Sequence, residues 1–264
     1  MAVMKRIFSV LVALAIAVPS FAGITYRFTT TVEGTRESAV SGVVKSDGPK
    51  GRVEITSGDE MIFRPGSVIL SSGNSVITVF DPAKKTYYEL DLEKYLRSTV
   101  GGQSPIVSVD VLNPHVSVRE LGAGPMMLGY PTHRARLVTS FELAPKFAGQ
   151  LQMQIGVNLD SEVWLTDKLP AAAANVLQSS RLRTGVPAID KMIDSSAVLR
   201  GFPLKQVTTS KITVGGSTSS GGKSTTVVSD VRETNLAPDE FSVPAGFTKI
   251  DDPLEAMLKN LGMR

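Results

Sequence analysis

The chain has 264 residues, of which 42% are hydrophobic and 20% are charged. This is ordinary globular composition, and the length suffices for one domain with a sizeable core. The formal net charge of +3 gives no support to nucleic-acid binding. The chain contains no cysteine, so neither disulfides nor a lipid-modified N-terminal cysteine can belong to the mature protein.

The first 22 residues have the features of a secretory signal peptide. Two basic residues, Lys5 and Arg6, precede an apolar run, and Ser20-Phe21-Ala22 brings small residues to the positions that a signal peptidase reads. The alternative, an uncleaved membrane anchor, needs roughly 20 apolar residues, and Pro19 interrupts the run well before that length. We therefore expect cleavage after Ala22, export to the periplasm or the medium, and a single mature domain of residues 23–264.

The mature chain begins with a pattern of short antiparallel strands. Apolar and polar residues alternate over residues 24–32, which is the period of a strand with one dry face. Asp47-Gly48-Pro49 and Gly73-Asn74 are turn signals in a series spaced too closely for long elements. Asp91 can cap a short helix over residues 91–97. The strands expected here are residues 24–32, 38–45, 52–56, 61–63, 68–70, 75–80 and 86–90.

The middle of the chain contains the clearest strand signal. Over residues 151–165, apolar side chains alternate with polar or small ones. Such clean alternation favours an antiparallel sheet with one solvated face, because parallel strands are usually covered on both faces. Before it we expect strands at residues 116–121 and 130–141. Residues 126–128 are an apolar patch that forms either a short buried strand or the lip of a pocket.

The last third adds helices and two closing strands. Pro170 and the four alanines after it predict a helix over residues 170–182, and a second is expected over residues 187–199. Strands at residues 204–214 and 225–234 flank an exposed Gly/Ser/Thr loop, and an amphipathic helix from Asp252 ends the chain. The whole predicts a mainly β (α+β) fold, a curved antiparallel sheet or incomplete β-barrel of about ten strands covered by helices.

The Gly/Ser/Thr loop, residues 215–224, is the first candidate for chemistry. It contains Gly222-Lys223-Ser224, but a phosphate-binding loop needs a glycine five residues before this triplet, where Ser217 stands. Both flanks also predict strands, whereas a phosphate loop opens a helix. We interpret the segment as an exposed, flexible hairpin loop.

The titratable residues do not form a catalytic or metal-binding pattern. His115 and His133 are the only histidines, and a zinc or iron site would need both in one place with an acidic ligand, because cysteine is absent. Acidic pairs such as Asp239-Glu240 and Asp251-Asp252 are explained as turn and cap residues. No G-x-S-x-G elbow occurs. We expect no metal, no cofactor and no enzymatic activity.

Apolar surface is the remaining candidate for function. A half-closed sheet under helices can leave a cavity for an acyl chain, whereas the simpler interpretation is that such side chains only fill a core. Methionines suit an adaptable apolar ligand. The residues expected to line the cavity are Tyr26, Phe28, Met126, Met127, Met153, Ile155, Val157 and Trp164.

Five segments carry a likeness to a known family. They are Y-x-F-x-x-x-V-E-G at residues 26–34, V-F-D-P-A-K-K-T-Y-Y-E-L-D at 79–91, E-V-W-L-T-D at 162–167, G-F-P-L-K at 201–205 and F-S-V-P-A-G-F at 241–247. With these segments the chain resembles exported domains related to the LolA-like lipoprotein carriers. The resemblance implies an incomplete barrel closed by helices, whose apolar interior receives lipid chains in the carrier members. The chain departs from the carriers in its length, in residues 100–131 and in its long hairpin loop.

These observations together lead to two hypotheses of different classes. The first is an exported, non-enzymatic binding protein for a lipid, a lipoprotein acyl chain or another apolar ligand, with peripheral contact to a membrane. The second is a cell-envelope interaction protein whose interior is filled by its own side chains and whose exposed strands or loops bind a partner.

Overall fold

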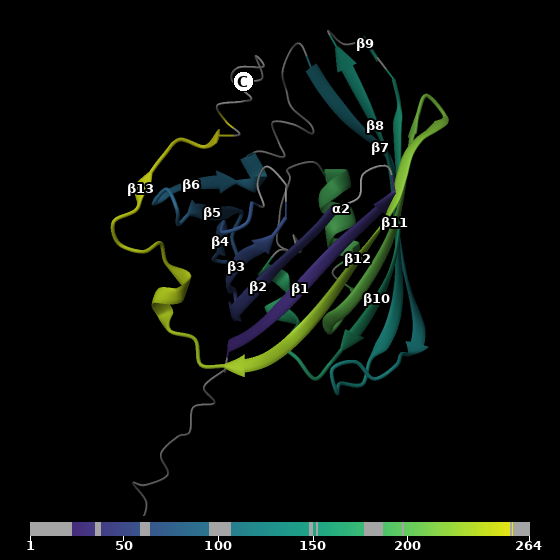
Figure 1. Cartoon of the computed structure of the whole chain (residues 1–264). Coiled ribbons are helices and arrows are strands. Elements are labelled where there is room, and N and C mark those ends of the chain that lie inside the picture. Colours follow the sequence, from purple (N-terminus) through teal and green to yellow (C-terminus); the bar gives the residue numbers. More distant parts are fainter. Residues whose placement is uncertain are drawn as a thin grey trace, which may run out of the picture.

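The computed structural model describes residues 23–34, 38–58, 64–94, 107–147, 150–151, 153–176, 187–196, 198–253 and 255. The predicted signal peptide lies outside these residues. The described part is dominated by one 13-stranded sheet with few helical segments (Figure 1). The sheet is strongly curved and does not close, which confirms the predicted fold class, a mainly β fold with a curved antiparallel sheet that forms an incomplete barrel.

The strands of the first part of the chain form a meander. They lie side by side in chain order, and every neighbouring pair among them is antiparallel. The short β13 (Thr248–Lys249) adds to β6 in parallel. We call this group the packed half; its strands are β1 (Gly23–Gly34), β2 (Ser38–Asp47), β3 (Lys50–Ser57), β4 (Val68–Ser71), β5 (Val76–Asp81), β6 (Thr86–Asp91) and β13.

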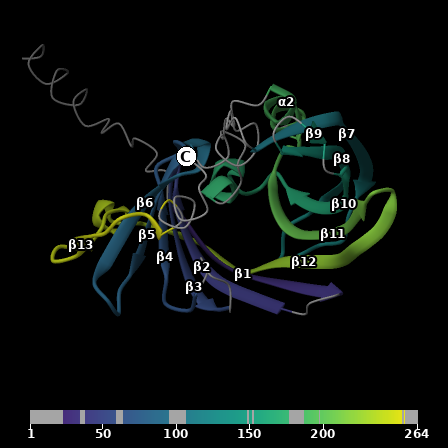
Figure 2. The ribbon, with the colours of Figure 1, turned by 90° about the horizontal axis from the view of Figure 1, so that it is seen from above.

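The remaining strands continue the sheet on the other side of β1. β12 pairs with β1, so the last long strand joins the first, and Phe28 stands opposite Val228. Seen from above, these strands curl round on themselves, whereas the packed half continues as a flatter arm (Figure 2). We call them the curled half; in sheet order they are β12 (Ser217–Thr234), β11 (Phe202–Val214), β10 (Ile155–Thr166), β8 (His133–Phe147) with the short β9 (Gln150–Leu151), and β7 (Val107–Ala123).

Irregular positions allow the long strands to bend. The register between β1 and β12 shifts next to Asp230, which has a φ of 53°, and the register between β7 and β8 shifts next to Asn113, with a φ of 50°. Asp and Asn tolerate this left-handed backbone better than most residues. Bulges of this kind bend a strand and increase its twist, so two polar residues support the curl.

The packed half has a dry core on its concave face. Val53 and Ile55 are 0% and 1% exposed, and they pack with Tyr26, Phe202 and Ala173 in one apolar cluster. Ala173 belongs to a short 3-10 helix, η1 (Ala171–Val176). Burial of one such Val or Ile side chain stabilises the fold by roughly 1.5–3 kcal/mol, so η1 completes a core that the strands alone leave open.

The opposite face of the packed half is covered by the end of the described chain. Val68, Leu70 and Phe80 form a second apolar cluster with Val243 and Phe247. The rings of Phe80 and Phe247 meet edge to face with centroids 5.4 Å apart, a favoured aromatic geometry. The covering segment follows η2 (Pro238–Phe241) and ends in β13. The packed half therefore has apolar layers on both of its faces.

Several strand bounds differ from the sequence expectation. β7 begins at Val107, well before the expected residue 116, and β8 continues to Phe147, beyond the expected end at residue 141. The predicted strand over residues 151–165 is split, because Met153 and Gln154 lie between β9 and β10 outside any strand. The predicted loop over residues 215–224 is wrong except for its first two residues. Gly215 and Gly216, with φ of 58° and 84°, make a tight turn of the kind that matches strand twist, and the polar residues after them belong to β12.

The helical predictions have mixed outcomes. The helix expected over residues 187–199 is confirmed as α2 (Pro187–Ser196). The helix expected over residues 170–182 is a 3-10 helix where it is described, with the Ala173 amide bonded to the Pro170 carbonyl, and residues 177–182 lie outside the described part. So do the expected strand at 61–63 and most of the helices expected over 91–97 and from Asp252 onward.

Candidate functional site

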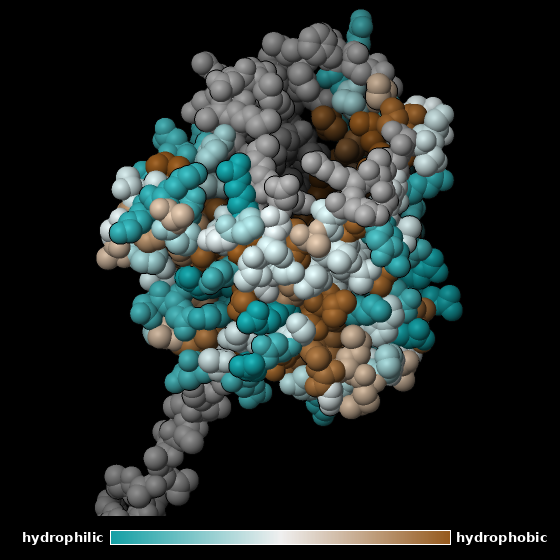
Figure 3. Space-filling model, in the orientation of Figure 1, coloured by the Kyte–Doolittle hydropathy of each residue, from teal (hydrophilic) through white to brown (hydrophobic). Residues whose placement is uncertain are grey.

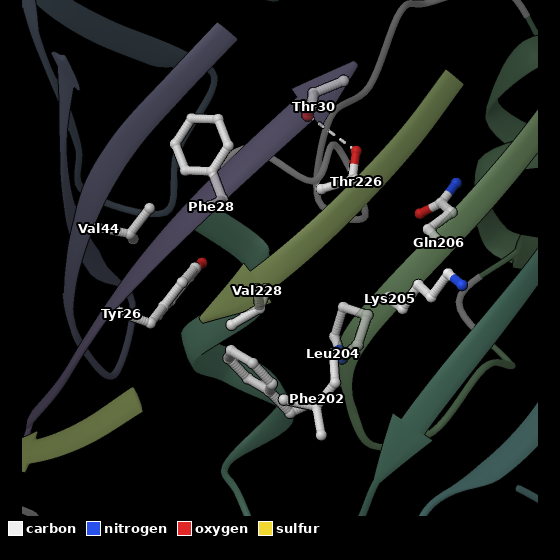
Figure 4. A pocket seen from close by; sticks show the side chains of 11 residues that line it. Tyr26, Phe28, Thr30, Val44, Phe202, Leu204, Lys205, Gln206, Thr226 and Val228 are labelled. Atoms are coloured by element: carbon white, nitrogen blue, oxygen red, sulfur yellow. Dashed lines mark hydrogen bonds between the residues drawn. The ribbon is translucent and has the colours of Figure 1, made fainter. Parts of the chain in front are cut away.

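A cavity of about 240 Å³ lies where the two halves meet. Aromatic and aliphatic side chains from β1, β2, β11 and β12 surround it (Figure 4). Its size lies between the roughly 150 Å³ of a cavity that holds benzene and the roughly 300–1,000 Å³ of small-molecule sites. It therefore has room for part of a hydrocarbon chain. The apolar lining consists of Tyr26, Phe28, Val44, Phe202, Leu204 and Val228.

Tyr26 and Phe202 form the rigid end of the cavity. Their rings meet edge to face with centroids 5.1 Å apart, and the Tyr26 hydroxyl donates a hydrogen bond of 3.3 Å to the Ala173 carbonyl of η1. Tyr26 is 7% exposed, and this burial raises the pKa of its phenol. The group stays neutral, so this end of the cavity offers no charge to a ligand.

The cavity continues into the inner face of the curled half. Thr226 stands opposite Gln206, Gln206 opposite Val163, and Val163 opposite Ala135. Paired residues of neighbouring strands share a face, so alternate residues along these strands lie on the cavity side. Many apolar side chains of this inner wall are only half-buried; they include Val116, Val118, Leu137, Phe141, Leu143, Ile155, Val157, Leu159 and Ile212.

A recess at the surface leads toward this wall. In Figure 3 hydrophobic surface lies inside a hollow at the upper right, where Figure 1 shows the ends of β7, β8 and β9. The opposite end of the wall is dry, because Ala135, Val163 and Leu165 are 0%, 4% and 3% exposed and pack against Leu199. The inner wall is thus sealed at one end and accessible at the other.

A strip of uncharged polar side chains interrupts the apolar surface beside the cavity. The Thr30 and Thr226 hydroxyls are 2.8 Å apart, as are those of Ser161 and Thr208, and Gln206 donates to Thr208 at 3.2 Å. Their strand pairings place these side chains on the cavity side of β1, β12, β11 and β10. We call Thr30, Thr226, Gln206, Thr208 and Ser161 the hydroxyl belt.

The structure brings some of the sequence-predicted cavity residues together. Tyr26 and Phe28 line the cavity, and Ile155 and Val157 lie on the inner wall. Met127 packs against the core cluster that contains Tyr26. Tyr26, Phe28 and Met127 thus belong to one apolar cluster, whereas Ile155 and Val157 lie on the same concave side of the sheet but beyond the hydroxyl belt.

The other three predicted cavity residues lie elsewhere. Met126 and Met153 are 65% and 47% exposed; Met126 precedes the small bridge between Met127 and Tyr130, and Met153 lies in the break before β10. Trp164 alternates with Val163 and Leu165, so it points to the convex face, where the Lys205 ammonium lies 4.8 Å from its ring centroid. Strand alternation separates Trp164 from the cavity even though it is large and apolar.

The convex face of the curled half carries paired charges. Arg134 contacts Glu162 at 3.2 Å, and the Arg136 Nε donates to Asp160 at 2.8 Å. The hydrogen bond from Arg136 holds the pKa of the Asp160 carboxyl below its usual value. Exposed pairs of this kind contribute little to stability, and they are typical of a solvated sheet face.

Within the described part of the chain, no three or more His, Asp or Glu side chains gather into a group that could hold a metal ion. The His133 Nδ1 lies 3.8 Å from a carboxylate oxygen of Asp167, a partner that sequence proximity did not indicate. His115 lies on β7 opposite Ser140, far along the hairpin from His133. Gly222-Lys223-Ser224 is inside β12 and precedes no helix. No described helix is long and apolar enough to cross a bilayer.

Sequence reasoning identified only Tyr26 and Phe28 among the six aromatic and aliphatic residues that line the cavity. Phe202, Leu204 and Val228 lie on or beside strands that the sequence predicted, but no alternation in these strands marked the three residues as inward-facing. Nothing local showed that β12 would bring β11 next to β1, because the Phe28–Val228 pairing joins residues from opposite ends of the chain. Gln206 and the threonines gave no signal, since polar residues in a strand are usually assigned to its wet face.

Comparisons with known proteins give structural neighbours only. No family model and no curated protein matches the chain. Similar solved structures include an uncharacterized conserved protein from Thermus thermophilus, with 11% identity, a TM-score of 0.36 and coverage of 86% of this chain and 90% of that chain. A LolA superfamily protein from Nitrosomonas europaea has 12% identity, a TM-score of 0.32 and coverage of 84% and 90%.

A third neighbour is a putative outer membrane lipoprotein-sorting protein domain from Vibrio parahaemolyticus, with 10% identity, a TM-score of 0.30 and coverage of 84% and 90%. LolA superfamily and lipoprotein-sorting proteins are thus among the structures similar to this chain, as the sequence resemblance predicted. At these identities and TM-scores the likeness carries no argument about this chain, and it assigns no ligand to it.

Proposed function

We propose that the chain is an exported, non-enzymatic binding protein that holds a lipid or another apolar ligand against the inner wall of its curled half. In this proposal residues 1–22 direct export and are removed, and the mature protein works in the periplasm. The ligand would place one hydrocarbon segment in the cavity beside Tyr26 and Phe202. The rest of it would lie along the inner wall.

The observation that carries this proposal is the incomplete burial of the inner wall. Ile155, Val157 and Phe141 face the concave side of the sheet and are half-buried, whereas Val53 and Ile55 in the packed half are almost fully buried. Contact with water disfavours such a surface by roughly 25 cal/mol for each Å² of apolar area. A ligand that covers it would recover this free energy, and the neighbouring cavity gives the ligand a fixed end.

Uptake of a neutral apolar dye tests the proposal. N-phenyl-1-naphthylamine fluoresces strongly only in an apolar environment, so binding can be titrated directly. Ile155→Trp adds a large side chain to the inner wall and should reduce dye uptake at least tenfold with little change in unfolding. Asn158→Trp is the matched control, because Asn158 is exposed on the same strand and points to the opposite face.

The two substitutions separate the hypotheses. A binding protein requires that the wild type and Asn158→Trp take up the dye and that Ile155→Trp does not. If the wild type takes up no dye, the interior is filled by its own side chains and the envelope interaction protein is the better account.

The predicted export is tested separately. Edman sequencing of the mature chain from its own host should give Gly23 as the first residue.

A further inference from the structure

The hydroxyl belt is the feature of the concave side that a purely apolar ligand does not explain. Thr30, Gln206 and Thr226 line the cavity together with its aromatic and aliphatic residues. Polar side chains on an inner face cost free energy when an apolar ligand covers them without replacing their hydrogen bonds with water. A ligand with a polar group at the same level would pair the hydrogen-bonding sites that the belt residues do not use among themselves.

The belt has hydrogen-bonding capacity left over. In each hydroxyl pair, Thr30 with Thr226 and Ser161 with Thr208, one proton is shared and the other can be donated elsewhere. Gln206 uses one N–H for Thr208, and its amide oxygen has no hydrogen-bond partner among the residues described. The belt can thus both donate to and accept from a ligand.

No charge lies in this strip. The five belt residues are uncharged, and the Tyr26 phenol is kept neutral by burial. Lys205 borders the cavity, but its ammonium lies over the Trp164 ring on the convex face, and Figure 4 shows its side chain directed away from Tyr26 and Phe28. A carboxylate or phosphate placed at the belt would lose hydration without gaining a cation from the residues that the structure describes.

We infer that the ligand is an amphiphile whose polar group at the belt is a neutral ester or amide, and that the protein discriminates against the corresponding free acid. A carbonyl oxygen would accept from a belt hydroxyl and from the second N–H of Gln206, and an amide N–H would donate to the Gln206 oxygen. The hydrocarbon on one side of this group would enter the cavity, and that on the other would follow the inner wall. This inference rests on the proposed function.

Displacement of N-phenyl-1-naphthylamine by ligands of equal chain length tests the inference at pH 8. The series is methyl decanoate, decanamide, decanoate and undecane. The ester and the amide should displace the dye about tenfold better than the ionised acid and better than the alkane, since a hydrogen bond typically changes affinity by up to about tenfold. Gln206→Leu and Thr226→Val should remove the preference for the ester over the alkane.

Thr209→Val is the control variant, because Thr209 is exposed on β11 and points to the convex face opposite Asp160. It should keep the wild-type preference. If the dye binds but the acid displaces it as well as the ester does, or if Gln206→Leu leaves the preference intact, the role of the belt is overturned and the apolar binding function stands. If the wild type binds no dye, the proposed function itself fails.

Discussion

The two halves of the sheet share one sequence pattern but differ in how their inner faces are covered. In the packed half Val53 and Ile55 are 0% and 1% exposed, because η1 completes the core on their side of the sheet. In the curled half Val157 and Ile155 follow the same alternation and remain half-buried. The difference lies in what packs against the strands and not in the strands themselves. One half is therefore suited to carry stability, and the other to accept a ligand.

A matched pair of isoleucines gives the largest expected contrast between the halves. Ile55→Ala should lower the free energy of unfolding by about 3 kcal/mol, within the roughly 2–5 kcal/mol usual for a fully buried site. Ile155→Ala should cost only about 1 kcal/mol, because much of the side chain is already in contact with solvent. Urea denaturation of both variants measures the two free energies of unfolding. Equal decreases in the two variants would contradict the division into two halves.

Two glycines sharpen the same comparison. A Cβ at Gly42, in the packed half, would meet the Glu54 carbonyl at 2.7 Å and the Phe28 ring at 2.6 Å, so Gly42→Ala should cost about 1–3 kcal/mol through overpacking. A Cβ at Gly156, in the curled half, would come closest to the Thr213 hydroxyl, which can rotate away. Thermal unfolding should show Gly156→Ala within about 0.5 kcal/mol of the wild type.

Tyr26 tests how firmly η1 is attached where the halves meet. Tyr26→Phe removes the hydrogen bond to the Ala173 carbonyl and should cost about 1 kcal/mol, while the apolar lining of the cavity is kept. Tyr130→Phe is the control, because Tyr130 packs against the same cluster and its hydroxyl has no hydrogen-bond partner within the described residues. Denaturation midpoints that shift equally for both variants would rule out a specific role for the Tyr26 hydroxyl.

The smallest effect is expected on the convex face of the curled half. The pKa of Asp160 is lowered by its hydrogen bond from Arg136, so its contribution to stability is present above the unfolded-state pKa of roughly 3.9. It is lost as the pH falls through the lower folded-state value. Asp160→Asn should cost less than about 1 kcal/mol at pH 7. The difference from the wild type should shrink as the pH falls from 7 through this transition, and a difference that does not change with pH would exclude the ion pair as the cause.

Much of the fold could be predicted from local sequence, for a definite reason. Alternation over residues 24–32 and the turn at Asp47-Gly48-Pro49 depend only on near neighbours, and β1, β2 and β3 lie where these signals indicated. The wrong prediction of a loop over residues 215–224 also arose because only near neighbours in the sequence were considered. Gly221 and Gly222 look like loop residues, but in β12 they allow the close approach of two backbone carbonyls. A Cβ at these glycines would stand 2.8 Å from the Ser210 oxygen and 2.7 Å from the Glu33 oxygen.

The candidate site could be predicted only in part, because it depends on contacts between distant segments. Tyr26 and Ile155 were recognised as inward-facing from their own strands. The cavity also needs Phe202 and Val228, which reach Tyr26 only because β12 pairs with β1. Trp164 is the opposite case. Its size favoured a place in the cavity, but the register of β10 places it on the convex face. The sequence of a strand does not show whether a helix or another segment will pack against it.

Native mass spectrometry of the mature protein purified from its own host tests the central claim most directly. If the inner wall holds an apolar ligand, the spectrum should contain the chain with an added mass of lipid size that organic extraction removes, and Ile155→Trp purified in parallel should lack it. A spectrum of the bare chain alone, before and after incubation with a lipid extract of the host, would contradict the account.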